Sequence, residues 1–277
     1  MQNLLAIYRA ERFSPNAAQR DMAIMDEVCN RLESLYIITK VKEENALLWS
    51  GNTAECSKPD IIISMARDKQ TLEWLHEKEA EGATVINRPA ALLKASRSFI
   101  DSVMRTNGLP AAPQESNCGW WIKRGDESAQ EKSDVVFAET DKERDEKISD
   151  FHRRGISNLV VTAHVVGDLV KFYGVQGTTF FRTFYPTDGN YSKFGDEKRN
   201  GTALHTPFYI DILNEDCNKL ATLTGIDIYG GDAIVRPDGS YAIIDFNDWP
   251  SFSACREEAA EAIAQKTIDT VNKKDNE

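Results

Sequence analysis

The fold of this chain is decided by one stretch near its C-terminus, Gly230-Gly-Asp-Ala-Ile-Val-Arg-Pro-Asp-Gly-Ser-Tyr-Ala-Ile-Ile-Asp-Phe-Asn-Asp-Trp-Pro-Ser-Phe252. Its middle part, residues 236–240, has the composition of a tight turn, because Pro presets φ and Gly adopts a positive φ without steric cost. β-forming residues flank the turn at 233–235 and 241–244. The stretch therefore predicts an antiparallel β-hairpin.

A two-residue loop at Asp238-Gly239 would place Asp232 opposite Asp245, and Asn247 would point to the same face. Like charges that face each other across two strands repel. A divalent cation relieves this repulsion, and Mg²⁺ held by one or two carboxylates plus substrate phosphates suits the three side chains. The alternative is a solvated hairpin face with incidental acids. The opposite face of the hairpin carries a predicted apolar core of Ala233, Val235, Ala242, Ile244 and Phe246.

Composition bounds the class of protein. The chain has 277 residues, enough for one large or two modest domains, and its net charge of −11 argues against a general nucleic-acid binder. Five cysteines without a CxxC spacing predict free thiols in a reducing cytoplasm. The N-terminus reads as a strand and not as a signal peptide, and no apolar run approaches the roughly 20 residues of a membrane span. We expect a cytoplasmic protein without membrane or nucleic-acid partners; the oligomeric state is left open, a homodimer included.

The first 89 residues alternate between strand and helix, which is typical of an open parallel α/β sheet. A single helix is expected over 90–107, ended by Gly108 and the prolines that follow. The strands are expected at 4–8, 35–38, 60–64 and 83–86, and the helices at 17–33 and 68–80.

Gly-Gly-Asp, a short hairpin and then Ile-Asp-Phe-Asn-Asp-Trp-Pro250 closely resembles the metal-binding end of ATP-grasp enzymes of the glutathione-synthetase and ribosomal-protein-glutamate-ligase type. The order of strand, Asn87-Arg-Pro89, long helix and Asn107-Gly-Leu-Pro-Ala-Ala-Pro113 is similar to the junction at which these chains enter their ATP-binding part. Most members carry Glu-x-Asn, whereas Asp-x-Asn is more similar to the inositol-polyphosphate-kinase branch. The resemblance covers about residues 83–265.

The resemblance implies an ATP-grasp fold: an α/β N-terminal domain with a parallel sheet (1–89) and an α+β ATP-grasp region (90–277). That region would have a small lobe at about 115–165 and a C-terminal lobe at 166–277. The implied cofactors are ATP and one or two Mg²⁺ ions, with Mn²⁺ as a substitute.

The resemblance also implies roles for individual residues. Lys123 matches the first nucleotide-binding lysine, Asp168 the ribose-binding residue, Lys171 a basic catalytic and cofactor-binding residue, and Arg182 an arginine against the transferred γ-phosphate. Ala163, His164 and Val165 match the hinge that reads the adenine, and Asp232, Asp245 and Asn247 match the metal ligands. Loop 124–134 matches a flap over the phosphates. Independently of the resemblance, the polar loop 186–207 is long for a compact domain, which indicates either a lid or a disordered segment, and its Lys193, Lys198 and Arg199 could close over a phosphate. Arg256 lies one turn past the metal strand and could reach the active site.

Plainer roles remain open for several of these residues. Lys123 is alternatively a surface lysine at a strand end, Arg182 an arginine paired to a carboxylate, and His164 a packing residue. The flap also departs from the family, because it is charged and nearly free of glycine, and Thr162 stands where Gln or Glu is usual at the hinge.

Open α/β sheets bind ligands at the carboxyl ends of their strands. Arg9 and Arg12 follow the first strand and Arg67 follows the third, which predicts a small-molecule, anionic substrate at that edge.

Three functions remain. The first is a ligase that joins a carboxylate to an amine or thiol through an acyl phosphate, and the second is a small-molecule kinase with a hydroxyl acceptor. The third is a non-catalytic nucleotide-binding module, against which the intact Lys123, Asp232, Asp245 and Asn247 argue. P-loop, dinucleotide-binding, hydrolase-elbow and zincin motifs are absent from the sequence. We favour the ligase.

Overall fold

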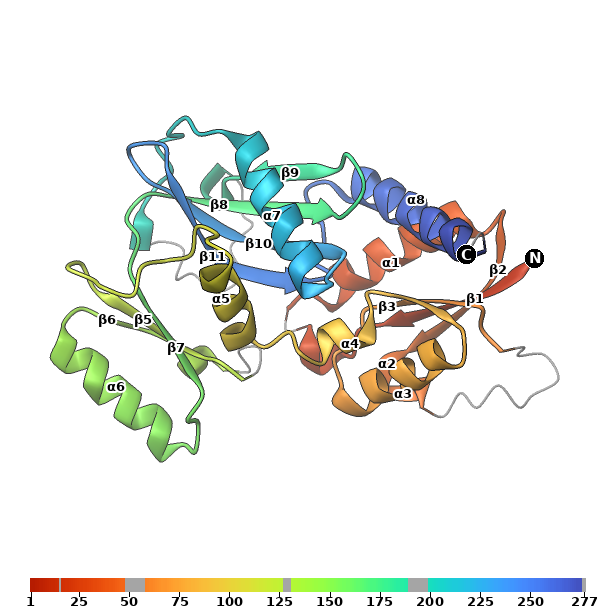
Figure 1. Ribbon diagram of the computed structural model, residues 1–277, viewed down its shortest axis with the longest axis horizontal. Helices are drawn as coiled ribbons and strands as arrows, with labels where there is room; N and C mark the ends of the chain where they lie inside the picture. Colours follow the sequence, from red (N-terminus) through yellow and green to blue (C-terminus); the bar gives the residue numbers. More distant parts are fainter. Residues whose placement is uncertain (15, 48–57, 127–130, 189–198, 276–277) are drawn as a thin grey trace.

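The N-terminal part of the chain is a parallel sheet with helices on its faces. A computed structural model describes residues 1–14, 16–47, 58–126, 131–188 and 199–275. The sheet has the order β2-β1-β3-β4 (Figure 1), and its strands are β1 (Gln2–Tyr8), β2 (Tyr36–Lys42), β3 (Ile61–Ser64) and β4 (Thr84–Ile86). The helices are α1 (Ala18–Leu32), α2 (Glu43–Ala46) and α3 (Lys69–Ala80). Continuous apolar runs form β1 and β3 because both faces of a central parallel strand are buried.

Two short helices, and not the single helix expected over 90–107, lead out of this sheet. They are α4 (Pro89–Leu92) and α5 (Arg97–Thr106). The prediction is wrong because Ser96 caps a new helix: its Oγ accepts the N–H of Phe99 at 3.2 Å. The break places Arg97 in the first turn of α5.

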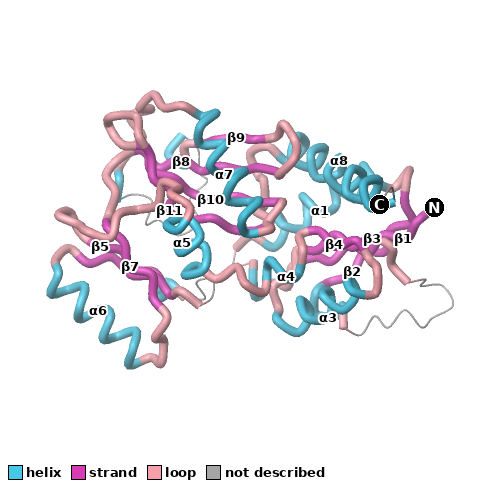
Figure 2. The backbone as a smooth tube through the Cα atoms, in the orientation of Figure 1, coloured by secondary structure: helices cyan, strands magenta, loops and turns pink. Residues whose placement is uncertain are grey.

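A small antiparallel sheet, the small-lobe sheet, follows at the end of the molecule that lies farthest from the N-terminal sheet (Figures 1 and 2). Its order is β6-β5-β7, with strands β5 (Trp120–Arg124), β6 (Val135–Ala138) and β7 (Leu159–Ala163). The helix α6 (Asp141–Arg153) covers one face through a cluster that includes Ile122 and Phe151. Lys123, next to Ile122, therefore points away from α6.

A second antiparallel sheet, the C-terminal sheet, has the order β11-β10-β8-β9. Its strands are β8 (Asp168–Val175), β9 (Phe181–Phe184), β10 (Ile228–Val235) and β11 (Tyr241–Asp248), and its helices are α7 (Ile210–Thr224) and α8 (Arg256–Asp275). One face buries Phe172 and Phe246 against α5 and α7, and α8 packs between β8 and α1 of the N-terminal part. Short 3₁₀ turns also lie at Glu11–Phe13, Lys132–Asp134 and Pro186–Asp188.

The predicted hairpin forms, but its register is irregular. On the turn side of the irregularity, Ala233 lies opposite Ile243; one step further from the turn, Asp232 lies opposite Asp245, so Ile244 is an extra, bulged residue. The loop is not the two-residue loop expected, because the N–H of Arg236 bonds to the carbonyl of Ser240, which leaves three residues between them. Consequently Ile243 is fully buried in the core, and Ile244, which we expected there, is only partly buried.

The glycine pair before Asp232 allows the strands to approach closely. A Cβ on Gly231 would lie 2.1 Å from the carbonyl oxygen of Asp245, and one on Gly230 would lie 2.7 Å from Cδ1 of Tyr173. A larger residue at Gly231 would push β10 away from β11, and one at Gly230 would displace the Tyr173 and Pro250 side chains, because Cβ contacts this short are essentially never observed.

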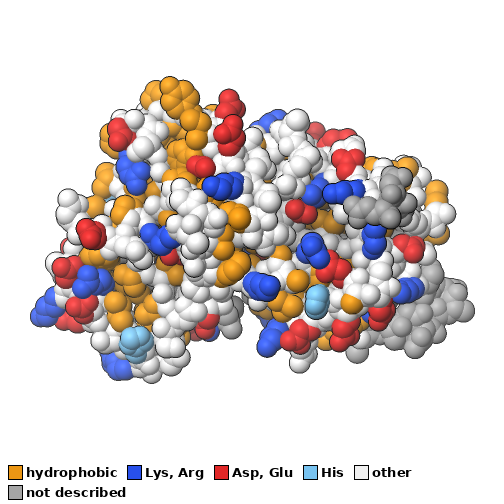
Figure 3. Space-filling view, viewed as in Figure 1, with side chains coloured by type: hydrophobic (Ala, Val, Ile, Leu, Met, Phe, Trp, Pro, Cys, Tyr) orange, Lys and Arg blue, Asp and Glu red, His pale blue; other side chains and the backbone are white. Residues whose placement is uncertain are grey.

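On the face drawn in Figure 3, acidic and basic side chains are interspersed, and hydrophobic side chains gather over the start of α7, where Tyr209, Ile210 and Ile212 are exposed. None of the helices in the described ranges combines the length and the apolar character of a membrane span.

Candidate functional site

Three oxygen-bearing side chains meet on β10 and β11. Asp232 lies opposite Asp245, and the amide of Asn247 donates to Oδ2 of Asp245 at 2.7 Å. Across the described residues no group of three or more His, Cys, Asp or Glu side chains could hold a metal. Two carboxylates and an amide are nevertheless the small oxygen set that Mg²⁺ completes with phosphate and water oxygens. Their role as ligands stays a prediction.

The fold surrounds the two aspartates with cations that are remote in sequence. Lys171 lies opposite Asp232, with Nζ 2.9 Å from Oδ1, and Nε of Arg97 lies 4.0 Å from Oδ1 of Asp245. Burial would raise the pKa of Asp245, but the charges of Arg97 and Lys123 outweigh it and hold the pKa below its usual value. The protein itself therefore relieves part of the repulsion between the aspartates.

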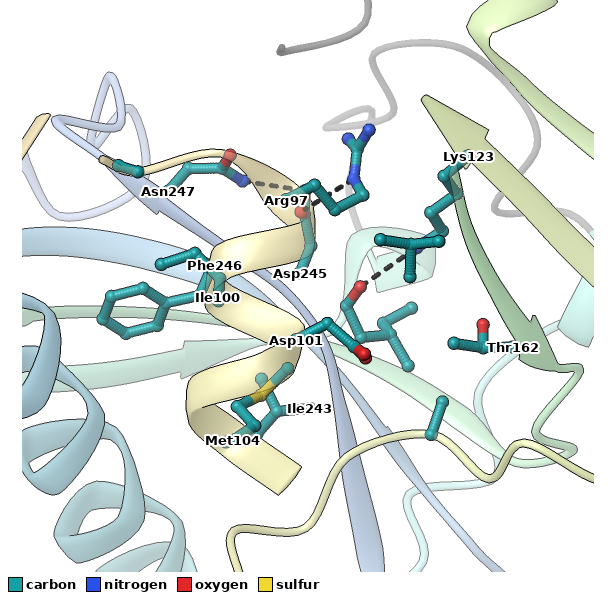
Figure 4. A pocket seen from close by; sticks show the side chains of 14 residues that line it. Arg97, Ile100, Asp101, Met104, Lys123, Thr162, Ile243, Asp245, Phe246 and Asn247 are labelled. Atoms are coloured by element: carbon teal, nitrogen blue, oxygen red, sulfur yellow. Dashed lines mark hydrogen bonds and ion pairs between the residues drawn. The ribbon is translucent and has the colours of Figure 1, made fainter. Parts of the chain in front are cut away.

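A pocket opens beside Asp245, between α5, the small-lobe sheet and β11 (Figure 4). Nζ of Lys123 donates to the carbonyl of Ile244 at 3.0 Å, so the bulged residue supplies its acceptor. Burial is the main cause that lowers the pKa of Lys123; Asp245 opposes the shift and Arg97 adds to it. The polar lining consists of Arg97, Asp101, Lys123, Thr162, Asp245 and Asn247.

Arg97 is a candidate site residue that we did not predict from the sequence. Its Nη1 donates to the carbonyl of Arg124 at 2.7 Å, whereas its buried Nε has no hydrogen-bond partner within the described part of the chain. A buried guanidinium nitrogen without an acceptor is unusual and suits an anion. One sequence signal for Arg97 was available: it is a basic residue one position after the N-cap Ser96, where the helix dipole favours acidic residues.

The expected hinge links the two antiparallel sheets, because it joins the end of β7 to the start of β8. Its backbone is engaged: the N–H of Ala163 donates to Pro113 at 2.7 Å, and the N–H of His164 donates to Gly119 at 2.8 Å. The carbonyl of Val165 accepts the amide of Asn200 at 3.2 Å. Adenine recognition by this segment stays a prediction.

An aromatic group lies next to the hinge, on the same face of the small-lobe sheet as Lys123. Trp121 and Phe137 face each other across the strands with ring centroids 5.3 Å apart, and the indole N–H of Trp121 donates to Nδ1 of His164 at 3.2 Å. Burial and the charge of Arg199 lower the pKa of His164. Because Nδ1 accepts a hydrogen bond and the pKa is low, the ring is neutral and suits packing better than proton transfer.

Asp168, expected near the ribose, holds a neighbouring segment. Its two carboxylate oxygens accept the N–H groups of Leu204 and Thr206, each at 2.7 Å. Burial opposes ionisation, but these hydrogen bonds outweigh it and lower the pKa of Asp168. Contact with a ribose stays a prediction.

Arg182 lies on the same face of the C-terminal sheet as Lys171, because Tyr173 pairs with Arg182 and Lys171 with Phe184. Its guanidinium forms an ion pair with Glu258 on α8 and donates to the carbonyl of Phe181 at 2.8 Å. The plainer role of a carboxylate-paired arginine is thus the one present in this structure, and a role at the γ-phosphate stays a prediction.

The N-terminal arginines separate into two groups. Arg9 and Arg67 converge on Asp248, at 3.3 Å and 2.7 Å, whereas Arg12 lies at the surface and pairs with Asp68. Arg9 is buried with its donors on protein oxygens. Substrate binding by these arginines remains untested, and for Arg9 it would require those bonds to break.

Some of the expected loop residues cannot be placed. Lys193, Lys198 and residues 127–130 of the expected flap lie outside the described residues. Arg199 stacks on Phe137, with its Cζ 3.7 Å from the ring centroid. The Nε atom of Arg256 is buried and has no hydrogen-bond partner in the described ranges.

The donor chemistry fits a magnesium–nucleotide complex. Lys123 and Arg97 offer positive charge to phosphates on one side of the pocket, and Asp245 and Asn247 offer oxygen ligands beside them. The unsatisfied Nε of Arg97 is a donor that a phosphate oxygen would complete.

Comparison with known proteins places this arrangement in context. No family model matches the sequence, and no curated protein matches it. Among solved structures, the D-alanine–D-alanine ligase from Coxiella burnetii is similar with a TM-score of 0.65 and 9% identity, over 100% of this chain and 98% of that chain. A RimK-domain ATP-grasp protein from Sphaerobacter thermophilus is similar with a TM-score of 0.64 and 13% identity, over 96% of this chain and 99% of that chain.

The ATP-grasp ligase PsnB, complexed with minimal precursor, Mg and ADP, is similar with a TM-score of 0.56 and 14% identity, over 97% of this chain and 98% of that chain. At such identities the likeness establishes the fold. It confirms the fold that we predicted from the sequence.

Proposed function

We propose that this chain, which has the ATP-grasp fold, is an ATP- and Mg²⁺-dependent ligase that joins a carboxylate to an amine or thiol through an acyl phosphate. The names of two structural neighbours mention D-alanine and a precursor peptide. We therefore propose a small molecule or a peptide as the acceptor.

One observation carries the proposal: four groups from three separate segments converge on one pocket with the charges that a magnesium–nucleotide needs. Arg97 comes from α5, Lys123 from β5, and Asp245 and Asn247 from β11. Arg97 Nε lies 4.0 Å from Asp245 Oδ1, and Asn247 lies 2.7 Å from Asp245 Oδ2 (Figure 4). A purely structural cluster would have little reason to leave the Nε of Arg97 unsatisfied.

Each side chain then has a separate task. Lys123 and Arg97 bind and orient the phosphates, and burial strengthens their attraction because water screens it less. Lys171 forms an ion pair with Asp232, and a bound cation would compete with it for this carboxylate. Lys171 is therefore the lysine that can leave Asp232 and contact the group being transferred. Mg²⁺, when bound, supplies neutralisation of the charge on the phosphates.

The kinase remains the second candidate, because β11 carries Asp-x-Asn. Both reactions use the same cations to offset the charge at the γ-phosphate, and they differ in the acceptor. A ligase releases ADP and inorganic phosphate, whereas a kinase releases ADP and leaves the phosphoryl group on a hydroxyl.

The first test is calorimetric titration with ADP, with and without Mg²⁺, on wild type and on Asp245→Ala. We expect Mg²⁺-dependent binding in wild type and its loss in Asp245→Ala. Asp238→Ala is the matched control, since Asp238 is an exposed acid at the turn of the same hairpin. Absence of ADP binding in the wild type would refute the nucleotide site.

The second test incubates wild type with ATP, Mg²⁺ and pools of amino acids and small peptides, and measures ADP and inorganic phosphate separately. Equal, acceptor-dependent release of both products supports the ligase. ADP without phosphate supports the kinase.

A further inference from the structure

Two arginines of the N-terminal sheet reach the C-terminal sheet beside the expected metal ligands. Arg9 follows β1 and Arg67 follows β3, and both contact Asp248, the last residue of β11. Asp248 is the neighbour of Asn247 in the chain. Residues more than 180 positions apart in the sequence therefore meet next to the site, since the contacts span 239 and 181 positions.

The two arginines form hydrogen bonds with both the side chain and the backbone at the end of β11. Nη2 of Arg67 donates to Oδ1 of Asp248 at 2.7 Å and to its carbonyl at 3.3 Å. Nη2 of Arg9 donates to Oδ2 of Asp248 at 3.3 Å and to the carbonyl of Trp249 at 2.9 Å.

The arginines are themselves held firmly by the N-terminal part. Arg9 has a side chain that is 6% exposed, and it also pairs with Asp21 at 3.3 Å and donates to the carbonyl of Met65 at 3.2 Å. The buried carboxylate of Glu43 accepts the backbone N–H groups of Ala10, Arg67 and Asp68 at 2.8, 2.6 and 2.6 Å. The backbone after β1 and after β3 is thus tied to one internal carboxylate.

This arrangement constrains the position of Asn247. Its amide is held by Asp245 on one side, and the next two residues, Asp248 and Trp249, are held by the guanidinium groups on the other. Trp249 has a φ of +36°, which a non-glycine residue adopts only where surrounding contacts impose it.

We propose that Arg9 and Arg67 are positioning residues that act through Asp248 to hold Asn247, and with it Asp245, in the geometry that binds Mg²⁺. The inference rests on the proposed nucleotide site and adds to it a contribution from the N-terminal part. It also replaces the substrate role that position alone suggested for Arg9 and Arg67, since their donors serve Asp248.

The test compares Arg67→Gln and Arg67→Lys with wild type. Arg67 is chosen because its side chain is 20% exposed, so that its replacement is tolerated better than replacement of the buried Arg9. Lys266→Gln is the matched control: the Lys266 side chain is 16% exposed and pairs with Asp227 at 3.2 Å, away from the pocket.

Two readouts are needed. The first is the Mg²⁺ concentration at half-maximal ADP binding, which we expect to rise at least about tenfold in Arg67→Gln, the usual effect of removing a group that orients a metal ligand. Arg67→Lys should recover part of the loss, because it keeps the charge. The second is amide hydrogen exchange over residues 246–250 without nucleotide, which should become faster in Arg67→Gln and not in Lys266→Gln.

The outcomes separate the two claims. If wild type binds ADP in a Mg²⁺-dependent way and Arg67→Gln has the same Mg²⁺ concentration at half-maximal ADP binding, the positioning role alone is overturned. Wild type that binds ADP equally with and without Mg²⁺ would overturn the metal site and the positioning role together, even if the exchange over 246–250 still shows that the arginines order this segment.

Discussion

Replacing Arg97 by glutamine should weaken ADP binding and make the remaining binding more dependent on Mg²⁺. The change removes a positive charge whose Nε lies 4.0 Å from Oδ1 of Asp245, in a side chain that is 17% exposed. Glutamine keeps a polar group and much of the length, so the packing of α5 is conserved.

The magnitude follows from two terms. A hydrogen bond to a charged group contributes about 1.5–3 kcal/mol, which corresponds to an increase in Kd of about 10- to 150-fold. The second term acts through Asp245. Two unit charges at 4 Å attract by about 4 kcal/mol at an effective dielectric constant of about 20, so the variant loses part of the attraction by which Arg97 offsets the negative charge of Asp245. The carboxylate then repels phosphate more and attracts Mg²⁺ more.

The assay is calorimetric titration of ADP at a series of Mg²⁺ concentrations. Arg31→Gln is the control, because Arg31 is 24% exposed and pairs with Glu27 and Glu261 between α1 and α8. We expect the Kd of Arg31→Gln for ADP to stay within about twofold of that of wild type, because the loss of a partly exposed ion pair has only a small effect. A Kd for Arg97→Gln within the same twofold range would refute the assignment of Arg97 to phosphate.

Three further outcomes are expected. Asp245→Ala should remove the Mg²⁺-dependent part of ADP binding while circular dichroism shows an intact fold; unfolding instead would mean that the acid is structural. Asn87→Ala should lower the free energy of unfolding in urea by about 2–3 kcal/mol, because the N–H of Ile228 loses its acceptor at 2.8 Å; a loss below about 1 kcal/mol would contradict this. Asp168→Asn should cost about 1.5–3 kcal/mol at pH 7 by the same measurement. Since the folded pKa of Asp168 lies below its unfolded value, near 3.9, this contribution is complete above about pH 4 and is lost as the pH falls through the folded pKa. The free energies of unfolding of wild type and Asp168→Asn should therefore converge in acid. A difference between them that persists in acid would exclude the charge of Asp168 as its cause.

Local signals were sufficient for most elements. Apolar runs bounded by turn residues located β1, β3 and β4, and the helix expected over 68–80 begins at Asp68, which caps α3 by accepting the N–H of Gln70 at 3.0 Å. These features depend on residues within a few positions of each other, which is the range over which turn and cap chemistry acts.

The parts that escaped prediction depend on tertiary contacts. No local pattern marks Ile244 as a bulge, because its place in the ladder is set by how β10 fits between β8 and β11. The same holds for Lys171 beside Asp232 and for Arg67 beside Asp248, pairs that are 61 and 181 positions apart. Only the tertiary structure brings these charged side chains together.

The bulge at Ile244 has a consequence for how this chain could change in length. Successive side chains on a strand alternate between its two faces, and the extra residue reverses that alternation once between the turn and Asp245. Codon insertions or deletions at the hairpin tip would therefore be tolerated in steps of two. A single-codon change would turn Asp245 into the apolar face beneath α5, unless the bulge were gained or lost at the same time. Loss of the bulge would in turn remove the carbonyl that anchors Lys123.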